Sequence, residues 1–344
     1  MSDAKGGFFH QPSLRQRMAL ALDDIWYGGN GLGVFLAPLG WLTAAAALGH
    51  RWCYQSGILA ATRIEVPVIV IGNLTVGGTG KTPLTISIAK RLKQHGFRPG
   101  IVCRGYRGHA KSWPQQVRAD SDPMMVGDEA VVLAKRTECP VAAAPRRAAA
   151  AAALVSHSGC DILLSDDGLQ HLALARDLEI VVVDGGRRLG NGRCLPAGPL
   201  REPDCRLASV DHVVVNGTAR PGEVEMRVQL GDPVCLRRPG LRRPLSAFKG
   251  PPVHAVCGIG NPERFFLQLE AAGLELIRHP YPDHHEFTAG QIQFDDALAV
   301  FMTEKDAVKC ARFALANQWA VPANAVVPES FFEDLLAALA PNKR

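Results

Sequence analysis

The residues with the clearest chemical potential lie in a glycine-rich segment, Gly72–Gly80, followed by Lys81 and Thr82. The run before it, Val66–Ile71, is apolar and β-branched, which predicts a buried strand. A proline in the first turn and a glycine past the last turn predict a helix that begins at Lys81. Such a strand–loop–helix unit is typical of a phosphate-binding P-loop, in which backbone N–H groups and the helix N-terminus hold phosphate oxygens.

This unit predicts an ATP site made of eight residues: Thr75, Val76, Gly77, Gly78, Thr79, Gly80, Lys81 and Thr82. Lys81 is expected to reach the β- and γ-phosphates as a catalytic residue, and the Thr82 hydroxyl to hold Mg²⁺. The loop departs from the strict G-x-x-x-x-G-K-[ST] pattern, because Thr75 stands at the first glycine position. It is similar to the deviant P-loops of dimerising ATPases, but Val76 replaces their trans-acting lysine.

A pair of carboxylates, Asp166 and Asp167, follows the apolar strand predicted for Asp161–Ser165. P-loop enzymes place their Mg²⁺-holding aspartate at such a strand end, where ligands of open α/β sheets bind. We therefore predict that Asp166 contributes to the metal shell and that Asp167 serves the reacting centre. The alternative is an ordinary Asp-Asp-Gly turn.

Two further segments carry candidate groups. Asp128 opens a predicted helix after Gly127, where an aspartate either caps the helix or points into a cleft. The segment 187–206 is a Gly- and Pro-rich loop whose arginines could hold a substrate phosphate or simply be solvated.

Alternating strands and helices predict an α/β fold with a parallel sheet and three parts. We expect residues 1–55 to form a hydrophobic N-terminal segment, residues 56–220 a P-loop core, and residues 221–344 a smaller α/β domain; the family resemblance described below makes the first part membrane-associated and the second a kinase core. Two strands near residues 223–237 are expected to connect the last two parts. A helix near Ser330–Leu339 is expected to close the smaller domain.

The N-terminal part contains an uncharged run, Ile25–Gly49, whose length approaches the roughly 20 residues of a membrane-spanning helix. Its glycines and Pro38 make it a poor isolated helix, whereas nearby Trp and Tyr residues suit a headgroup boundary. Spanning the bilayer, lying in its interface, and forming a buried helical hairpin all remain open.

Composition limits the remaining possibilities. The 344 residues are 47% hydrophobic, which is typical of a globular protein of two ordinary domains. The formal charge of +5 is mild and no Lys/Arg run suits nucleic acid. Nine scattered cysteines without a C-x-x-C pair indicate a reducing compartment, with neither a disulfide framework nor a zinc site.

In this order, the motifs GNLTVGGTGKTP, CRGYRG, VGDE, SDDGLQH, LPAGPLRE, PDH and MTEKDAVKC are very similar to those of the tetraacyldisaccharide 4′-kinase (lipid A 4′-kinase) family. The resemblance covers nearly the whole chain and includes the altered P-loop. It implies a P-loop α/β core, a smaller C-terminal α/β domain and an N-terminal hydrophobic helix. It also implies transfer of the γ-phosphate of ATP to the 4′-hydroxyl of a membrane-embedded tetraacyldisaccharide 1-phosphate, giving lipid IVA at the cytoplasmic face of the inner membrane.

The resemblance further implies roles for individual residues. Asp128 becomes the base for the acceptor hydroxyl, supported by His284 of the PDH motif. Polar motif residues are expected to bind the substrate, and basic loops suit an anionic membrane surface; these residues are Arg104, Gln170, His171, Arg201 and Glu202. Two rivals are a soluble P-loop small-molecule kinase and a nucleotide-switch ATPase acting on a protein partner. Acyl-chain preference and oligomeric state are not determined by the sequence.

Overall fold

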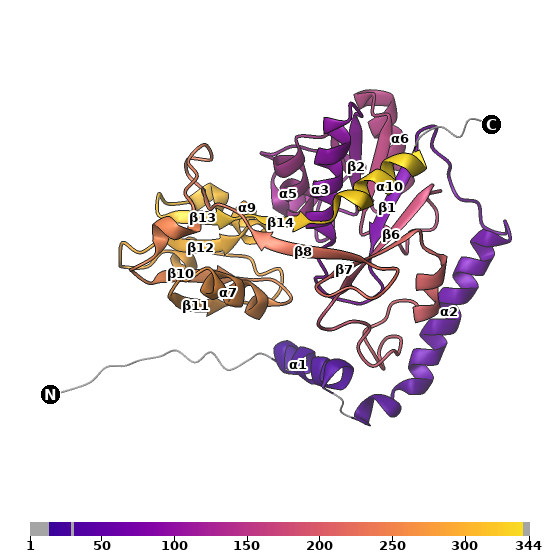
Figure 1. Cartoon of the computed structure of the whole chain (residues 1–344), viewed down its shortest axis with the longest axis horizontal. Coiled ribbons are helices and arrows are strands. Elements are labelled where there is room, and N and C mark those ends of the chain that lie inside the picture. Colours follow the sequence, from indigo (N-terminus) through magenta and orange to yellow (C-terminus); the bar gives the residue numbers. More distant parts are fainter. Residues whose placement is uncertain (1–13, 29–30, 340–344) are drawn as a thin grey trace.

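Two largely parallel β-sheets organise the chain in the computed structural model, which describes residues 14–28 and 31–339 (Figure 1). The larger sheet has nine strands in the order β14-β8-β7-β6-β1-β5-β2-β4-β3. Their bounds are β1 Val68–Gly72, β2 Pro99–Cys103, β3 Gln115–Val117, β4 Val141–Ala143, β5 Ile162–Asp166, β6 Leu178–Asp184, β7 His212–Asn216, β8 Val224–Leu230 and β14 Ala323–Val326. The helices around it are α3 Lys81–Gln94, α4 Pro123–Val126, α5 Asp128–Thr137, α6 Arg147–Ser158 and α10 Glu329–Leu339, with the 3-10 turn η2 Asp204–Ser209.

The central strand β1 is buried on both faces because helices cover the sheet on both sides. Ile69 and Ile71 pack with residues of α3 and α5, whereas Val68 and Val70 pack with residues of α6 on the opposite face. Successive side chains of a strand alternate between faces, so a strand covered on both faces reads as one apolar run. Full burial contributes about 1.5–3 kcal/mol for each such side chain. The predicted strand and its parallel neighbours β5 and β6 are confirmed.

The smaller sheet has five strands in the order β11-β10-β12-β13-β9 and forms the second α/β unit. Its strands are β9 Val234–Cys235, β10 Val253–Cys257, β11 Leu276–Pro280, β12 Val300–Thr303 and β13 Gln318–Val321. Its helices are α7 Pro262–Ala271, α8 Ala289–Ile292 and α9 Glu304–Cys310, with the short 3-10 turns η3 Leu245–Phe248 and η4 Ala311–Phe313. A smaller C-terminal α/β unit is therefore present, as predicted.

The connection between the units differs from the prediction in its second strand. β8 pairs antiparallel with β14, so that Leu230 lies opposite Ala323, whereas β9 belongs to the smaller sheet. The chain thus returns to the larger unit after β13. The final helix α10 follows β14 and buries Phe331 and Leu335 in the same hydrophobic core as residues of α3. Placing all of residues 221–344 in the smaller domain is therefore wrong for β14 and α10, because α10 buries its apolar face against the larger unit. The predicted long loop before Pro123 also contains β3, which pairs antiparallel with β4.

The N-terminal part consists of α1 Leu14–Tyr27, the 3-10 turn η1 Gly31–Val34 and α2 Ala37–Gln55. α2 runs along the side of the larger unit that faces away from the smaller sheet (Figure 1). Within the described residues, no helix is both long enough and apolar enough to cross a membrane. Residues 29 and 30 of the predicted apolar run lie outside the described residues.

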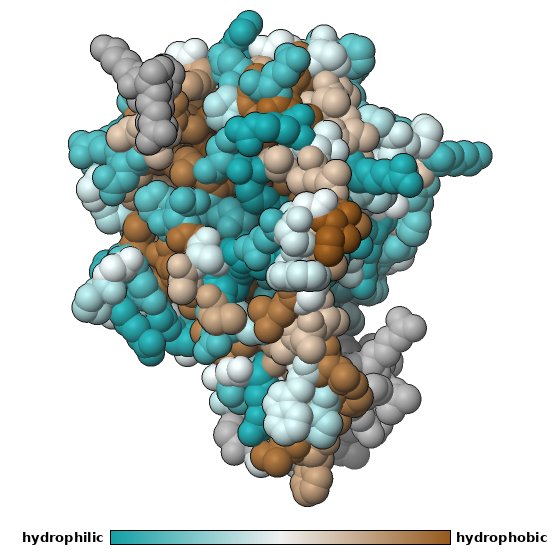
Figure 2. Space-filling model, turned by 90° about the vertical axis from the view of Figure 1, so that its right-hand side faces the viewer, coloured by the Kyte–Doolittle hydropathy of each residue, from teal (hydrophilic) through white to brown (hydrophobic). Residues whose placement is uncertain are grey.

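α2 exposes large apolar side chains to solvent. Trp41 is 70% exposed and Leu42 67%, and Phe35, two residues before the helix, is 82% exposed, although side chains of these types are usually buried. Figure 2 faces the side that bears α2 and shows hydrophobic residues gathered over the protruding lower part of the molecule. The opposite face of α2 is buried at Ala37 and Gly40. Exposed apolar side chains that lie together are typical of a surface that contacts another protein or a membrane.

Candidate active site

The glycine loop predicted for phosphate binding joins β1 to α3 at the carboxyl edge of the larger sheet. Gly77 and Gly80 have φ angles of 103° and 104°, which residues with a Cβ rarely adopt. The buried Asn73 holds the loop, since its side-chain amide donates to the Thr75 carbonyl at 2.6 Å and to the Gly77 carbonyl at 3.3 Å. These bonds preorganise the turn that precedes the helix N-terminus.

Asn216 fixes the far side of the same loop. Its Nδ2 donates to the Thr79 carbonyl at 3.1 Å, and its Oδ1 accepts from Arg264 of the smaller unit at 2.7 Å. Sequence reasoning missed Asn216, because the end of β7 carries no motif that points to the P-loop. Its position is fixed only by the strand order that sets β7 two strands from β1.

Thr82 and Asp166, the two predicted metal ligands, lie together behind the loop. The Thr82 hydroxyl donates to Asp166 Oδ2 at 3.3 Å, and the Thr85 hydroxyl donates to Oδ1 at 2.8 Å. Asp166 is only 2% exposed. Burial, together with the charge of Glu129, raises the pKa of its carboxyl to about 6. A buried carboxylate beside a hydroxyl supplies the hard oxygen donors that Mg²⁺ prefers.

Asp167 sits in the turn after β5 and faces cations. Its Oδ1 lies 3.4 Å from Lys81 Nζ and 3.4 Å from Arg201 Nη1. Burial works to raise the pKa of Asp167, but Lys81, Arg201 and Arg147 outweigh it and lower the pKa to about 2. The two adjacent aspartates therefore have opposite electrostatic surroundings.

A buried arginine, Arg147, supports this turn and was not predicted. It begins α6, is 2% exposed, and its Nη2 donates to the carbonyls of Asp166 at 2.9 Å and Asp167 at 2.7 Å. Its own backbone N–H donates to His171 Nε2 at 3.3 Å. Burial, reinforced by Arg147, lowers the pKa of His171 to about 4, so His171 is neutral at pH 7. His171 thus offers no positive charge to a phosphate.

Gln170 ties the P-loop to the predicted substrate loop. Its Nε2 donates to the Asn73 carbonyl at 3.1 Å and to Glu202 Oε1 at 2.9 Å, and its Oε1 lies 3.4 Å from Arg201. Gln170, Arg201 and Glu202, which the sequence predicted separately, are therefore brought together beside Asp167. Arg104 lies exposed just after β2. Its charge acts on His171 from that side.

Asp128 and His284 come from different units and meet across the interface between them. His284 Nδ1 lies 3.2 Å from Asp128 Oδ2, while Asp128 Oδ1 accepts the Glu129 backbone N–H at 2.8 Å. Burial would raise the pKa of Asp128, but the hydrogen bond to His284 and the charge of Lys305 hold it below its ordinary value. The same hydrogen bond raises the pKa of His284. Asp128 therefore carries a negative charge at neutral pH.

Helices α5 and α9 hold this interface together through ion pairs. Lys305 pairs with Glu129 beside Asp128, and Arg136 Nη1 lies 2.6 Å from Glu304 Oε2. Glu129 also acts on Asp166, which shows that the VGDE and SDDGLQH motifs share one electrostatic environment. The MTEKD motif thus contributes the cations and anions that join the two units.

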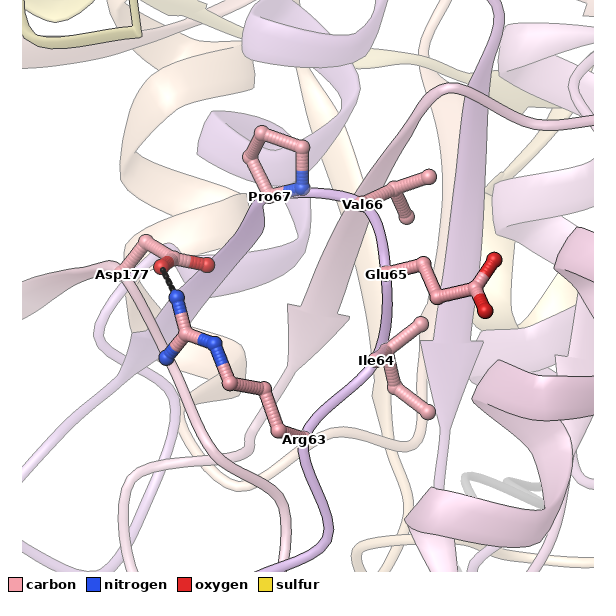
Figure 3. A pocket seen from close by; sticks show the side chains of 6 residues that line it. All are labelled: Arg63, Ile64, Glu65, Val66, Pro67 and Asp177. Atoms are coloured by element: carbon pink, nitrogen blue, oxygen red, sulfur yellow. Dashed lines mark hydrogen bonds and ion pairs between the residues drawn. The ribbon is translucent and has the colours of Figure 1, made fainter. Parts of the chain in front are cut away.

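A recess of about 280 Å³ opens at this interface and includes Asp128 and His284 in its lining. Arg107, His109 and Lys309 add basic groups to its wall. A larger recess of about 360 Å³ lies at the amino end of β1, where the Arg63–Asp177 ion pair spans 2.8 Å (Figure 3). That recess is at the opposite end of β1 from the P-loop. In parallel α/β sheets ligands bind at the carboxyl ends of strands, so the smaller recess is the candidate acceptor site.

A glycine loop after β1, paired aspartates at the end of the neighbouring strand β5, and an Asp–His pair completed by the second unit together suit a phosphotransferase. The sequence profile of the LpxK family, described as "Tetraacyldisaccharide-1-P 4'-kinase", matches residues 32–340. The chain belongs to this tetraacyldisaccharide 4′-kinase family and is a kinase. Neither rival, the small-molecule kinase or the nucleotide-switch ATPase, agrees with this result.

Individual relatives agree with the family assignment. A tetraacyldisaccharide 4′-kinase from Nitrosococcus oceani is 53% identical over 91% of this chain and 93% of its own. Another, from Alkalilimnicola ehrlichii, is 50% identical over 89% and 92%. The crystal structure of LpxK from Aquifex aeolicus in complex with ATP superposes with a TM-score of 0.78 at 25% identity, covering 90% of this chain and 99% of that one.

Proposed function

We propose that this protein transfers the γ-phosphate of ATP to the 4′-hydroxyl of tetraacyldisaccharide 1-phosphate, giving lipid IVA. The observation that carries the proposal is the Asp128–His284 pair, which lines a recess at the interface between the two units. Phosphoryl transfer requires mainly positioning and charge neutralisation, and both are available here. The residue roles that follow are part of the same proposal.

Asp128 acts as the general base toward the acceptor hydroxyl. A sugar hydroxyl must lose its proton as it attacks phosphorus, and a carboxylate with a lowered pKa is ionised and ready to accept it. His284 holds one carboxylate oxygen, which leaves the orientation of Asp128 dependent on contact between the two units. Closure of the units would then complete the site and exclude water at the same time.

Lys81 and Arg201 neutralise charge on the transferred phosphoryl group. Both lie 3.4 Å from Asp167, which orients them while no phosphate is bound. Residues 75–80 supply backbone N–H groups to the phosphates of ATP, and the start of α3 adds partial positive charge. Gln170, which bonds Glu202, contacts Arg201 next to the loop. Arg104 and His171 belong to the same proposed substrate-binding set.

Mg²⁺ fits the residues present. Thr82 and Asp166 are 3.3 Å apart, and burial of the Asp166 carboxyl with a raised pKa favours a cation that compensates its charge. These two residues would hold the ion. A Mg²⁺ ion held there would supply positive charge that offsets the negative charge of the phosphates.

The protein acts at the cytoplasmic face of the inner membrane, where its acylated substrate resides. The exposed Trp41, Leu42 and Trp52 of α2, with Phe35 just before it, support contact with the bilayer, since together they present apolar and aromatic surface to solvent. An orientation in the plane of the interface suits a helix with one face docked on the protein.

The direct test is phosphate transfer from radiolabelled ATP to the purified tetraacyldisaccharide 1-phosphate, followed by thin-layer chromatography. A labelled lipid that depends on Lys81 is expected. Release of the label only as inorganic phosphate, or its transfer to a soluble sugar in preference to the lipid, would overturn the proposal. Flotation with anionic vesicles tests the membrane part: replacing Trp41 and Leu42 by Ser should move protein out of the vesicle fraction.

A further inference from the structure

The N-terminal helices make an unexpected contact with the active-site loop formed by residues 191–201. Trp26 Nε1 donates to the Pro196 carbonyl at 3.0 Å, and the Trp26 carbonyl accepts the Asn191 backbone N–H at 2.9 Å. Ala44 of α2 packs against a buried cluster that includes Cys194 and Leu200. The inner face of α2 therefore packs on this loop, whereas its apolar outer face is exposed to solvent.

Gly40 is the point of closest approach between α2 and loop 191–201. A Cβ at this position would lie 2.9 Å from the Cys194 carbonyl oxygen and 3.0 Å from the Ala197 Cβ. A Cβ at Gly33 would lie 3.0 Å from the Ala197 carbonyl oxygen of the same loop. Ala197 is fully buried. Only glycine lets the helix backbone sit this close, so the docking is specific in its geometry.

Loop 191–201 is in turn bonded to the P-loop. The Val76 N–H donates to the Pro199 carbonyl at 2.9 Å, and the Arg201 N–H donates to the Leu74 carbonyl at 2.7 Å. Thr75 and Leu200 form an antiparallel bridge. The same loop ends at Arg201 beside Asp167. One layer of backbone thus separates the N-terminal helices from the phosphate-binding residues.

We propose that α1 and α2 are a structural support of the ATP site as well as the membrane contact, with Gly40 and Trp26 as positioning residues. Their docking fixes loop 191–201, and through it the P-loop and Arg201. This inference rests on the proposed function, because it takes the Lys81 loop as the ATP site. It makes ATP affinity depend on a contact some distance from the nucleotide, whether or not a bilayer is present.

The test compares two glycines of the same helix in the full-length protein. Gly40→Ala forces the helix or the loop to shift by a few tenths of an ångström, whereas a Cβ at the exposed Gly49 meets nothing within 4 Å. Both changes favour the helix equally and add one methyl group to it. ATP affinity is measured by titration without lipid acceptor, and kcat/KM for ATP is measured in detergent micelles.

We expect Gly40→Ala to weaken ATP affinity and kcat/KM about tenfold, since a 1 Å misplacement in an active site can cost about 10²-fold. Gly49→Ala should stay within about twofold of the parent by the same reasoning. Flotation with vesicles should be unchanged in both variants. Trp26→Phe keeps an aromatic ring but loses the indole N–H that donates to the Pro196 carbonyl, and should shift ATP affinity in the same direction with an unchanged melting temperature.

Three results would overturn the inference. One is ATP affinity in Gly40→Ala and Trp26→Phe equal to that in Gly49→Ala. Another is a loss of activity that follows a loss of vesicle binding, as expected of an anchor alone. The third is a loss that follows the melting temperature while ATP affinity is retained. Lys81→Ala, assayed in parallel, separates the two proposals: normal lipid phosphorylation by it would refute the proposed function itself.

Discussion

Replacing Asp128 by Asn tests whether this residue is a base or has only a structural role at the start of α5, where Gly127 is the N-cap and Asp128 the first helical residue. The structure gives its carboxylate two different bonds: Oδ1 accepts the Glu129 N–H at 2.8 Å, and Oδ2 faces His284 Nδ1 at 3.2 Å. Asparagine keeps one oxygen for the Glu129 N–H but cannot accept a proton. The substitution therefore preserves the bond to the Glu129 N–H and removes the group that would accept the proton.

The two roles differ in the size and kind of loss. Removal of a general base costs about 10²–10⁴ in rate with the fold unchanged. Loss of a cap costs about 1 kcal/mol of stability and leaves turnover intact. Because Asn cannot accept the proton, we expect turnover to fall by at least about 10²-fold. Because the bond to the Glu129 N–H survives, the melting temperature should change little.

Asp122→Asn is the matched control. Asp122 caps the short helix α4 by accepting the Met124 N–H at 2.9 Å, and its substitution removes the same charge six residues from Asp128. Asn is as good a cap as Asp, so this variant should retain parental activity and stability. Lipid phosphorylation at saturating ATP is assayed together with thermal melting. If Asp128→Asn turns over like Asp122→Asn, Asp128 has only a structural role and the catalytic assignment is refuted.

Three further predictions concern the same site. Lys81→Ala should lower the rate of phosphate transfer by at least about 10²–10³, because it removes a charge that stabilises the transition state; near-parental transfer would exclude the P-loop role. Asp166→Asn should raise the Mg²⁺ concentration needed for half-maximal activity more than Asp167→Asn does, and the reverse order in a metal titration would exchange their roles. For His284, whose pKa is raised above 6.5 by its bond to Asp128, the stabilisation is complete below pH 6.5 and is lost as the pH rises through the raised value. His284→Gln should therefore lower the melting temperature more at pH 6 than at pH 9, and a pH-independent difference would contradict a charged His284–Asp128 pair.

The local elements of the site could be predicted from the sequence because their causes are local. The β-branched run before Gly72 and the Gly-Lys-Thr after it specify a strand, a loop with positive φ angles and a helix within one short stretch. The placement of Asp166 at a strand end follows from the apolar run before it. The motifs also indicated the family, which the comparisons confirm.

Contacts between distant segments were decided only by the tertiary structure. The pairing of β8 with β14 sends α10 back to the larger unit, because its Phe331 and Leu335 find their apolar partners there. Arg147, whose buried side chain donates to the Asp166 carbonyl, stands at the start of an alanine-rich helix, and that local sequence does not indicate this contact. Neither position carries a local signal, since β-strand pairing and buried hydrogen bonds join residues that are far apart in the chain.

The same distinction explains the N-terminal part. Its apolar composition is visible in the sequence, and so is the uncertainty about how it meets a membrane. The sequence does not show that one face of α2 docks on loop 191–201 through Gly40, because a glycine in a helix carries no mark of what lies opposite it. Which face is buried depends on the shape of the surface that the rest of the chain presents, and that surface exists only after the sheet has formed.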